Sequence, residues 1–305
     1  MSSQQVVGGV GDASQEAAAP GTAPLGTLSP SRAGDFLSCP LLYRFRSVDR
    51  LPEPVSLDAL RGTVVHRVLE QLYDLPAPQR TPERAGALVP GAWAEILTQE
   101  PEAQEGFADD AAREAWLATC ETSVRRYFDL EDPTRLEPAD RELYVETLLE
   151  SKLLVRGIVD RVDVAADGAI RVVDYKTGRA PGVGWEAKAL FQLRIYALAL
   201  WRERGVLPAM LQLLYLGDGQ VIRYEPDAQS LMATERKLEA VWRAIATAHE
   251  TGEFLPHRSG LCGWCAHQAI CPAWGGTPPP LPDSLVSRPV SGPVTSPGGP
   301  PPPAP

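Results

Sequence analysis

The chain of 305 residues contains no apolar run close to the roughly 20 residues that a membrane-spanning helix needs. Its N-terminus also lacks a basic segment followed by an apolar one, which is the pattern of a secretion signal. Five cysteines without such a signal fit a disulfide framework poorly. We therefore expect a cytoplasmic protein that has no membrane partner.

An excess of positive charge and a nucleotide-binding loop are missing as well. The formal net charge of -10 argues against a protein that coats nucleic acid through bulk electrostatics, although a local basic groove would be compatible with DNA. Arginines do cluster near the first cysteine, at positions 32, 44, 46 and 50. No G-x4-G-K-[ST] motif is present, so any unwinding of a duplex must come from another polypeptide, such as a helicase acting in trans.

The two ends of the chain have compositions that do not build a core. Residues 1–28 are rich in Gly, Ala, Ser and Gln, and residues 276–305 form a Pro/Gly/Ser tail. We expect both tails to be disordered. The remaining segment, 29–275, is long enough for one domain with a sizeable hydrophobic core.

Hydrophobic periodicity predicts helices on both sides of a group of strands. The expected helices cover residues 31–38 (capped by Ser31), 57–73, 83–99, 109–130, 185–201 and 227–250. The expected strands cover residues 142–149, 152–164, 169–178, 210–216 and 220–224. This order favours an α/β fold, in which helices flank a mixed central β-sheet and a helical lobe precedes the first long strands.

Two of the expected strands carry acids and a lysine toward one point. Because side chains alternate along a strand, Asp174 and Lys176 share a face while Tyr175 points away. Asp160 on the preceding strand can meet them if Asp167-Gly168 forms a hairpin turn. Two carboxylates at one point could hold a hard divalent cation. The alternative is that the three charged side chains form ordinary ion pairs on the strands.

This pattern resembles the D…(D/E)-x-K constellation of the PD-(D/E)XK nuclease superfamily, and specifically its RecB-like branch with a D-Y-K-T-G ending. Further blocks resemble that branch and occur in its order. They are SRAGDFLSCPLLY (31–43), GTVVHRVL (62–69), QLRIY (192–196) and CGWCAHQAICP (262–272). The resemblance covers about residues 29 to 275 and implies a restriction-endonuclease-like core that hydrolyses DNA.

Asp160 and Asp174 are the expected direct ligands of Mg²⁺ or Mn²⁺. The resemblance implies two further ligands, which are the backbone carbonyl of Tyr175 and the side chain of His66 in the G-x3-H helix. Without the resemblance, His66 would be interpreted as a packed helix histidine. Lys176 would orient or deprotonate the attacking water and stabilise negative charge, and we expect its pKa to be perturbed.

Other polar residues surround these positions. Gln192 and Tyr196 share a helix face and could reach the cleft or the DNA backbone, the alternative being an exposed Gln and a core Tyr. Glu146 could support the site from outside the ligand shell, with Glu142 as a competitor. Asp163 lies on the opposite strand face from Asp160, so we expect it to pair with an arginine.

Three cysteines, Cys262, Cys265 and Cys271, have C-x2-C-x5-C spacing, and Cys39 is the natural fourth thiolate. The resemblance to RecB-like nucleases of the AddB and CRISPR-associated types implies that these four bind a [4Fe-4S] cluster, which would close the core into a ring. A zinc site, with or without His267, and free buried thiols remain alternatives. Cys120 lies on an apolar helical stripe, where we expect it to be simply buried.

Three functions follow from these patterns. The leading interpretation is a metal-dependent DNA exonuclease of the RecB-like family that acts on single-stranded ends in DNA repair or recombination. The second is a module that keeps the fold and cluster but grips DNA or a helicase without cutting, and the intact Asp160, Asp174 and Lys176 count against it. The third is a zinc-stabilised interaction protein with no nucleic-acid role.

Overall fold

A computed structural model describes residues 25–182 and 186–282, apart from the side chains of residues 186–188. The helices are α1 (Pro30–Ser38), α2 (Pro40–Tyr43), α3 (Leu57–Leu72), α4 (Pro82–Gln99), α5 (Asp110–Leu130), α6 (Glu186–Arg204) and α7 (Ala228–Thr251). The strands are β1 (Gly26–Leu28), β2 (Asp140–Leu148), β3 (Leu153–Val164), β4 (Ile170–Lys176), β5 (Met210–Tyr215) and β6 (Gln220–Tyr224). These elements confirm the predicted α/β fold, in which helices flank one mixed sheet.

The sheet is organised around β3, which has neighbours on both edges. Strand β2 pairs antiparallel with β3 along one edge. The other edge is shared, because β1 pairs in parallel with Leu153–Val155 and β4 pairs antiparallel with Arg161–Val164. Beyond β4 the order continues through β5 to β6. Between the β1 and β4 pairings, residues 156–160 of β3 have no strand partner on that edge among the described residues.

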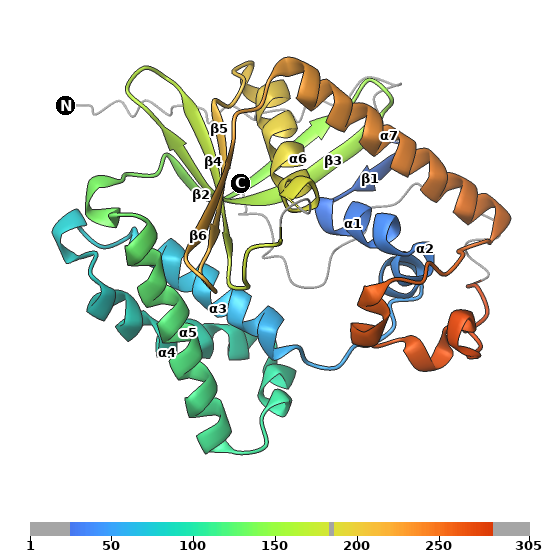
Figure 1. Ribbon diagram of the computed structural model, residues 1–305, viewed down its shortest axis with the longest axis horizontal. Coiled ribbons are helices and arrows are strands. Elements are labelled where there is room, and N and C mark those ends of the chain that lie inside the picture. Colours follow the sequence, from blue (N-terminus) through green and yellow to red (C-terminus); the bar gives the residue numbers. More distant parts are fainter. Residues whose placement is uncertain (1–24, 183–185, 283–305) are drawn as a thin grey trace, which may run out of the picture.

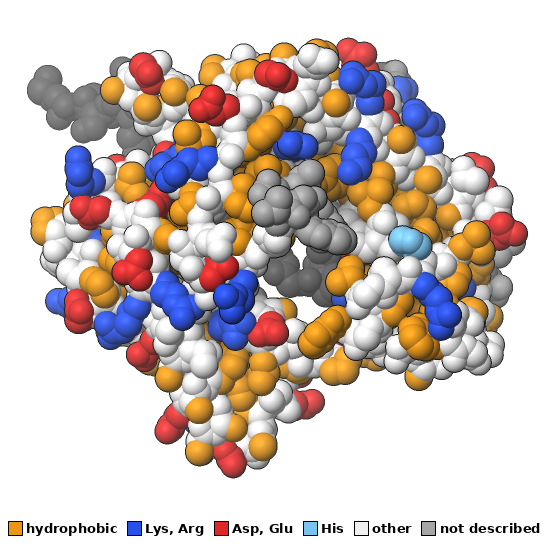
Figure 2. Space-filling view, in the orientation of Figure 1, with side chains coloured by type: hydrophobic (Ala, Val, Ile, Leu, Met, Phe, Trp, Pro, Cys, Tyr) orange, Lys and Arg blue, Asp and Glu red, His pale blue; other side chains and the backbone are white. Residues whose placement is uncertain are grey.

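Helices cover both faces of the sheet. Figure 1 shows α3, α4 and α5 grouped on one side, and α6, α7 and α1 on the other. Alternate residues of β4 enter the two cores, since Val172 packs with the α6 side and Val173 with the α3–α5 side. Among the described residues, every helix is too short or too polar to cross a membrane. Figure 2 shows Lys and Arg side chains gathered over α6 and α7.

Three features near the ends of the domain differ from the sequence-based expectation. Helix α1 begins at Pro30, and Ser29 rather than Ser31 caps it by accepting a hydrogen bond from the Arg32 amide. Strand β1 lies within the expected tail 1–28, and a glycine is required at Gly26 because the Trp242 ring occupies the position of a Cβ. In the expected tail 276–305, Leu281 packs against the core. Residues 1–24 and 283–305 of these tails lie outside the described residues.

One buried arginine connects the sheet to the helical lobe. Arg161 on β3 is fully buried and donates to the hydroxyls of Tyr73, Tyr127 and Tyr175 at 3.2, 3.1 and 2.8 Å. These tyrosines come from the end of α3, from α5 and from β4 respectively. Glu131 lies 2.8 Å from the guanidinium and balances its charge. The lobe is therefore fixed to the strands by polar contacts as well as by apolar packing.

Asp163 belongs to the same network. Its carboxylate lies 3.1 Å from Arg161 Nε and 2.8 Å from Arg171 Nη2. The expected pairing of Asp163 with an arginine is confirmed. Because Arg161 and Asp163 share a strand face opposite to that of Asp160, the network occupies the α3–α5 side of the sheet.

Replacing Arg161 by methionine tests how much the network contributes. The substitution keeps an extended side chain but leaves Glu131 and the three hydroxyls without their common donor, so we expect the free energy of unfolding to fall by about 3 to 5 kcal/mol. Urea unfolding measures this change. Arg125→Met, which removes an exposed 3.8 Å pair with Glu83, is the control and should cost less than about 1 kcal/mol. A similarly small loss for Arg161→Met would contradict the assignment.

Candidate active site

The site forms where the β3–β4 ladder ends. The last pair of the ladder joins Arg161 to Val173, and two residues further on the Tyr175 amide donates to Asp160 Oδ2 at 2.7 Å. A side-chain carboxylate thus replaces the backbone carbonyl that would have continued the ladder. The Asp167-Gly168 turn connects these strands as expected, with Gly168 at a φ of +85°.

Side chains from three elements gather beside Asp160. Three possible metal-ligand atoms lie within 4.8 Å of one another, and they come from His66 on α3, Glu142 on β2 and Asp160 on β3. His66 Nδ1 lies 3.5 Å from Asp160 Oδ2, and His66 Nε2 lies 2.8 Å from the carbonyl oxygen of Tyr175. Adjacent ligands of an octahedral Mg²⁺ ion are separated by about 2.9 Å, as follows from bonds of about 2.1 Å. The contact between His66 Nε2 and the Tyr175 carbonyl oxygen is a hydrogen bond, and it holds the imidazole beside the two acids.

Asp174 lies beside this group and is almost completely buried, with 1% of its surface exposed. Its Oδ2 lies 2.7 Å from Lys176 Nζ, and neither carboxylate oxygen accepts a well-oriented hydrogen bond from a described residue. Burial, and then the charge of Asp160, raise the pKa of Asp174 to about 6. A buried carboxylate that has Lys176 as its partner and lies next to a second carboxylate, an imidazole and a backbone carbonyl fits a hard divalent cation.

Glu142 is the acid that joins the site from β2. In the β2–β3 register it stands opposite Asp160, whereas Glu146 is exposed and accepts a hydrogen bond from the Tyr144 hydroxyl. Glu142 has a φ of +45°, a strained value for a residue with a side chain. Burial and the charge of Asp160 raise its pKa to about 7. Of the two acids weighed from the sequence, the structure thus brings Glu142 to the site.

Lys176 is held from both sides. Its ammonium donates to Gln192 Oε1 at 3.1 Å in addition to its contact with Asp174. Burial lowers the pKa of Lys176, but the negative charges of Asp174 and Asp160 together outweigh burial, so the net shift of the pKa is upward. The lysine is therefore held protonated, which favours the role of a charge-stabilising donor over that of a base.

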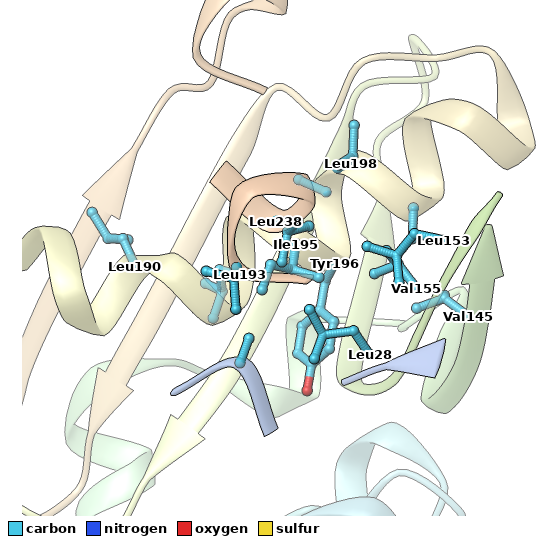
Figure 3. Packing of buried hydrophobic residues seen from close by; sticks show 14 of the residues in the cluster. Leu28, Val145, Leu153, Val155, Leu190, Leu193, Ile195, Tyr196, Leu198 and Leu238 are labelled. Atoms are coloured by element: carbon cyan, nitrogen blue, oxygen red, sulfur yellow. The ribbon is translucent and has the colours of Figure 1, made fainter. Parts of the chain in front are cut away.

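Gln192 is itself fixed by Tyr196. Gln192 Nε2 donates to the Tyr196 hydroxyl at 2.7 Å. Figure 3 shows the Tyr196 ring packed near Leu28, with its hydroxyl pointing out of the apolar cluster. The ring lies so close to β3 that a Cβ on Gly157 would be 2.5 Å from Tyr196 Cε1. The expected shared helix face of Gln192 and Tyr196 is present, and it points toward Lys176.

The four cysteines expected to share a metal centre line one cavity of about 60 Å³. Cys39 Sγ accepts a hydrogen bond from the His257 amide, and Cys262 Sγ accepts one from the Ser259 amide, each at 3.3 Å. Among the described residues, no three of the four sulfurs lie within 4.8 Å of one another. Tetrahedral zinc with bonds of about 2.3 Å would hold all four sulfurs about 3.8 Å apart, a spacing that no three of these sulfurs share.

The other two candidate residues near this cavity have different surroundings. His267 is buried, with its Nε2 2.9 Å from Glu53 Oε1 and its ring against Phe45, so it does not line the cavity. Cys120 is fully buried in the α3–α5 core, as expected.

The raised pKa of Asp174 predicts a pH-dependent stability. The pKa of Asp174 is about 6 in the folded protein and near 3.8 in the unfolded chain, so the folded state binds this proton more tightly. The free energy of unfolding therefore falls as the pH rises from about 4 to above 6. Asp174→Asn removes the buried charge. We expect the variant to exceed the wild type by about 1 to 3 kcal/mol at pH 8 in EDTA, and the difference to shrink toward pH 4.

Urea unfolding at both pH values measures this difference. Asp167→Asn, in the exposed β3–β4 turn, is the control and should leave stability unchanged. An Asp174→Asn protein that is less stable than the wild type at pH 8 would refute the electrostatic account of this site.

Two known proteins are similar to parts of this chain. The Gene 69 protein of Mycobacterium phage D29 is 27% identical over 205 residues, which are 58% of this chain and 70% of the phage protein. One subunit of an ATP-dependent helicase/deoxyribonuclease from Streptococcus pyogenes is 30% identical over 119 residues, which are 39% of this chain. The matched region is only 11% of that Streptococcus protein.

Solved structures and family models supply the last comparison. The crystal structure of a proposed exonuclease from Eubacterium rectale shares the fold, with a TM-score of 0.51, 14% identity, and coverage of 80% of this chain and 88% of that one. The model of one family matches residues 27–272, a range that includes β3, β4 and all the side chains described above. The chain therefore belongs to the PD-(D/E)XK nuclease superfamily.

Proposed function

We propose that this protein is a metal-dependent DNA exonuclease that hydrolyses phosphodiester bonds at single-stranded ends, in DNA repair or recombination in the cytoplasm. The observation that carries the proposal is the buried Asp174, paired with the half-buried Lys176, beside His66, Glu142 and Asp160. This arrangement places carboxylates for a cation and a fixed ammonium at one point. Membership of a nuclease superfamily supports the reaction type.

Mg²⁺ or Mn²⁺ would be held by Asp160, Asp174, His66 and the Tyr175 carbonyl, with Glu142 as a further carboxylate in reach. When bound, such an ion makes water nucleophilic near neutral pH and stabilises charge on the phosphate. The protein's own contribution is to position these ligands and Lys176. The ammonium, fixed by Gln192, would donate to the attacking water or to the phosphate as negative charge develops.

A helicase partner in trans is part of the proposal. The relative from Streptococcus pyogenes carries helicase in its name, whereas this chain has no G-x4-G-K-[ST] motif. Strand separation by a partner would supply the single-stranded ends. The competing function is a DNA-binding module that does not cut.

Cleavage of end-labelled DNA by anaerobically purified protein tests the reaction. We expect the wild type to release nucleotides from single-stranded DNA with Mg²⁺ or Mn²⁺ and to be inactive in EDTA. Asp174→Ala and Lys176→Ala should each lower the rate by at least about 100-fold, because they remove a metal ligand and the charge-stabilising donor. Asp167→Ala, in the exposed turn, should cut like the wild type. A wild type that binds DNA without ever cutting it would favour the binding-module function.

We further propose that Cys39, Cys262, Cys265 and Cys271 bind a [4Fe-4S] cluster. All four line one cavity, and a cluster spaces its thiolates more widely than a single zinc ion does. Cys39 precedes the nuclease core and the other three follow it. Metal binding would therefore close a loop of more than 200 residues and restrict the unfolded chain.

Metal analysis of the anaerobically purified protein tests the cluster. We expect about four iron atoms and four sulfides per chain, with a brown colour, and we expect Cys265→Ser to lose both. Cys120→Ser is the matched control, because this cysteine lies in the α3–α5 core and should leave the iron content unchanged. One zinc per chain with no iron would contradict the cluster.

A further inference from the structure

A second and much larger cavity opens beside the catalytic lysine. It has a volume of about 1180 Å³ and is lined by α1, the loop after β4, α6 and α7, with Lys176 and Gln192 among its lining residues. Pockets for drug-sized ligands have volumes of about 300 to 1000 Å³. This cavity, called here the α6–α7 groove, is therefore large enough for a segment of polymer.

The charged lining of the α6–α7 groove has one sign. Its charged residues are Lys176, Arg179, Arg194 and Lys237, and no Asp or Glu is among the described lining residues. The whole chain has a net charge of -10, so the groove is a local exception on an acidic protein. Lys and Arg side chains gather over the same two helices in Figure 2. A polyanion is the ligand that this charge pattern would attract.

Two of these cations are available to a ligand. Among the side chains that the structure describes, Arg194 and Lys237 have no carboxylate within 4.0 Å. Each is held against an aromatic ring instead. The Lys237 ammonium lies 4.2 Å from the ring centre of Phe191, and the Arg194 guanidinium lies 4.3 Å from that of Tyr224. The charges are thus fixed at the groove without being neutralised.

Apolar side chains line the groove as well as the cations. Leu37, Pro181, Phe191 and Ala233 line the groove together with Arg194 and Lys237. A duplex presents mainly phosphates and sugars to a protein surface, whereas a single strand also exposes the faces of its bases. Cations mixed with apolar and aromatic surface are the combination that binds single strands with little sequence preference.

We propose that the α6–α7 groove is the binding track for a single nucleic-acid strand, with Arg194 and Lys237 contacting phosphates remote from the one that is cut. Lys176 lines this groove, so the strand would lead to the proposed cleavage site. The statement that the strand leads there rests on the proposed nuclease function. The binding itself does not depend on cleavage. Arg194 and Lys237 are therefore assigned to strand binding and have no part in the chemical step.

Binding of fluorescein-labelled oligothymidine of about 12 nucleotides, followed by fluorescence anisotropy in EDTA across a salt series, tests the proposal. The variant Arg194→Gln/Lys237→Gln should bind at least about tenfold more weakly than the wild type. Its log-log salt slope should be smaller by about 1.4, because each phosphate contact to a single strand contributes about 0.7. A blunt duplex of the same length should bind the wild type more weakly than oligothymidine does.

Arg236→Gln is the matched control, since Arg236 is an exposed arginine next to Lys237 on α7 that does not line the groove. It should retain the wild-type affinity and slope. If the double variant does not fold, exposed Lys237→Gln alone should reduce the slope by about 0.7. Wild-type binding by these variants, or equal affinity of the wild type for duplex and single strand, would overturn the proposal.

The outcomes separate this inference from the proposed function. A wild type that never cuts, but binds oligothymidine through Arg194 and Lys237, would refute the nuclease and leave the groove assignment intact. A wild type that cuts, together with a double variant that binds normally, would refute the groove assignment alone.

Discussion

The hydrogen bond from the Tyr175 amide to the Asp160 carboxylate is the constraint on which the site depends. It stands where the β3–β4 ladder ends, so part of the β3 edge has no strand beside it among the described residues. Helix α3 brings His66 to this place from one side of the sheet, and α6 brings Gln192 from the other. Because the ladder ends here, side chains from the helices on both faces of the sheet can reach the same point.

The site carries an electrostatic cost that the surrounding fold offsets. Burial and the charge of Asp160 raise the pKa values of Asp174 and Glu142, and Glu142 also has a strained backbone. On the opposite sheet face, the buried Arg161 binds hydroxyls from both α3 and β4. These are two of the elements that carry the site, so the network maintains the geometry that the acids alone would destabilise.

The element order and the central pair of acids could be predicted because they depend on local patterns. Alternation along one strand is enough to place Asp174 and Lys176 together. The choice of Glu142 over Glu146 was beyond sequence reasoning, because it depends on β2–β3 register and on a positive φ. Sequence alone could not show how exposed the N-terminal arginine cluster is, and in the structure Arg44 and Arg46 form ion pairs with nearby acids. The α6–α7 groove is lined by segments that are far apart in the sequence, so no short stretch of sequence could predict it.

Asp160 and Arg161 are neighbours in sequence that face opposite sides of β3. A slip of β3 by one residue would turn both side chains to the opposite face, because side chains alternate with a period of two. If the slip brought the Arg161 guanidinium into the acidic site, Val162 would take its place and Glu131 would lose its nearest arginine. One charge would then be buried beside the wrong partner and another would lose its partner, so a misaligned strand would be penalised twice. The same dipeptide that serves the chemistry and the packing therefore also protects the chain against folding in the wrong alignment.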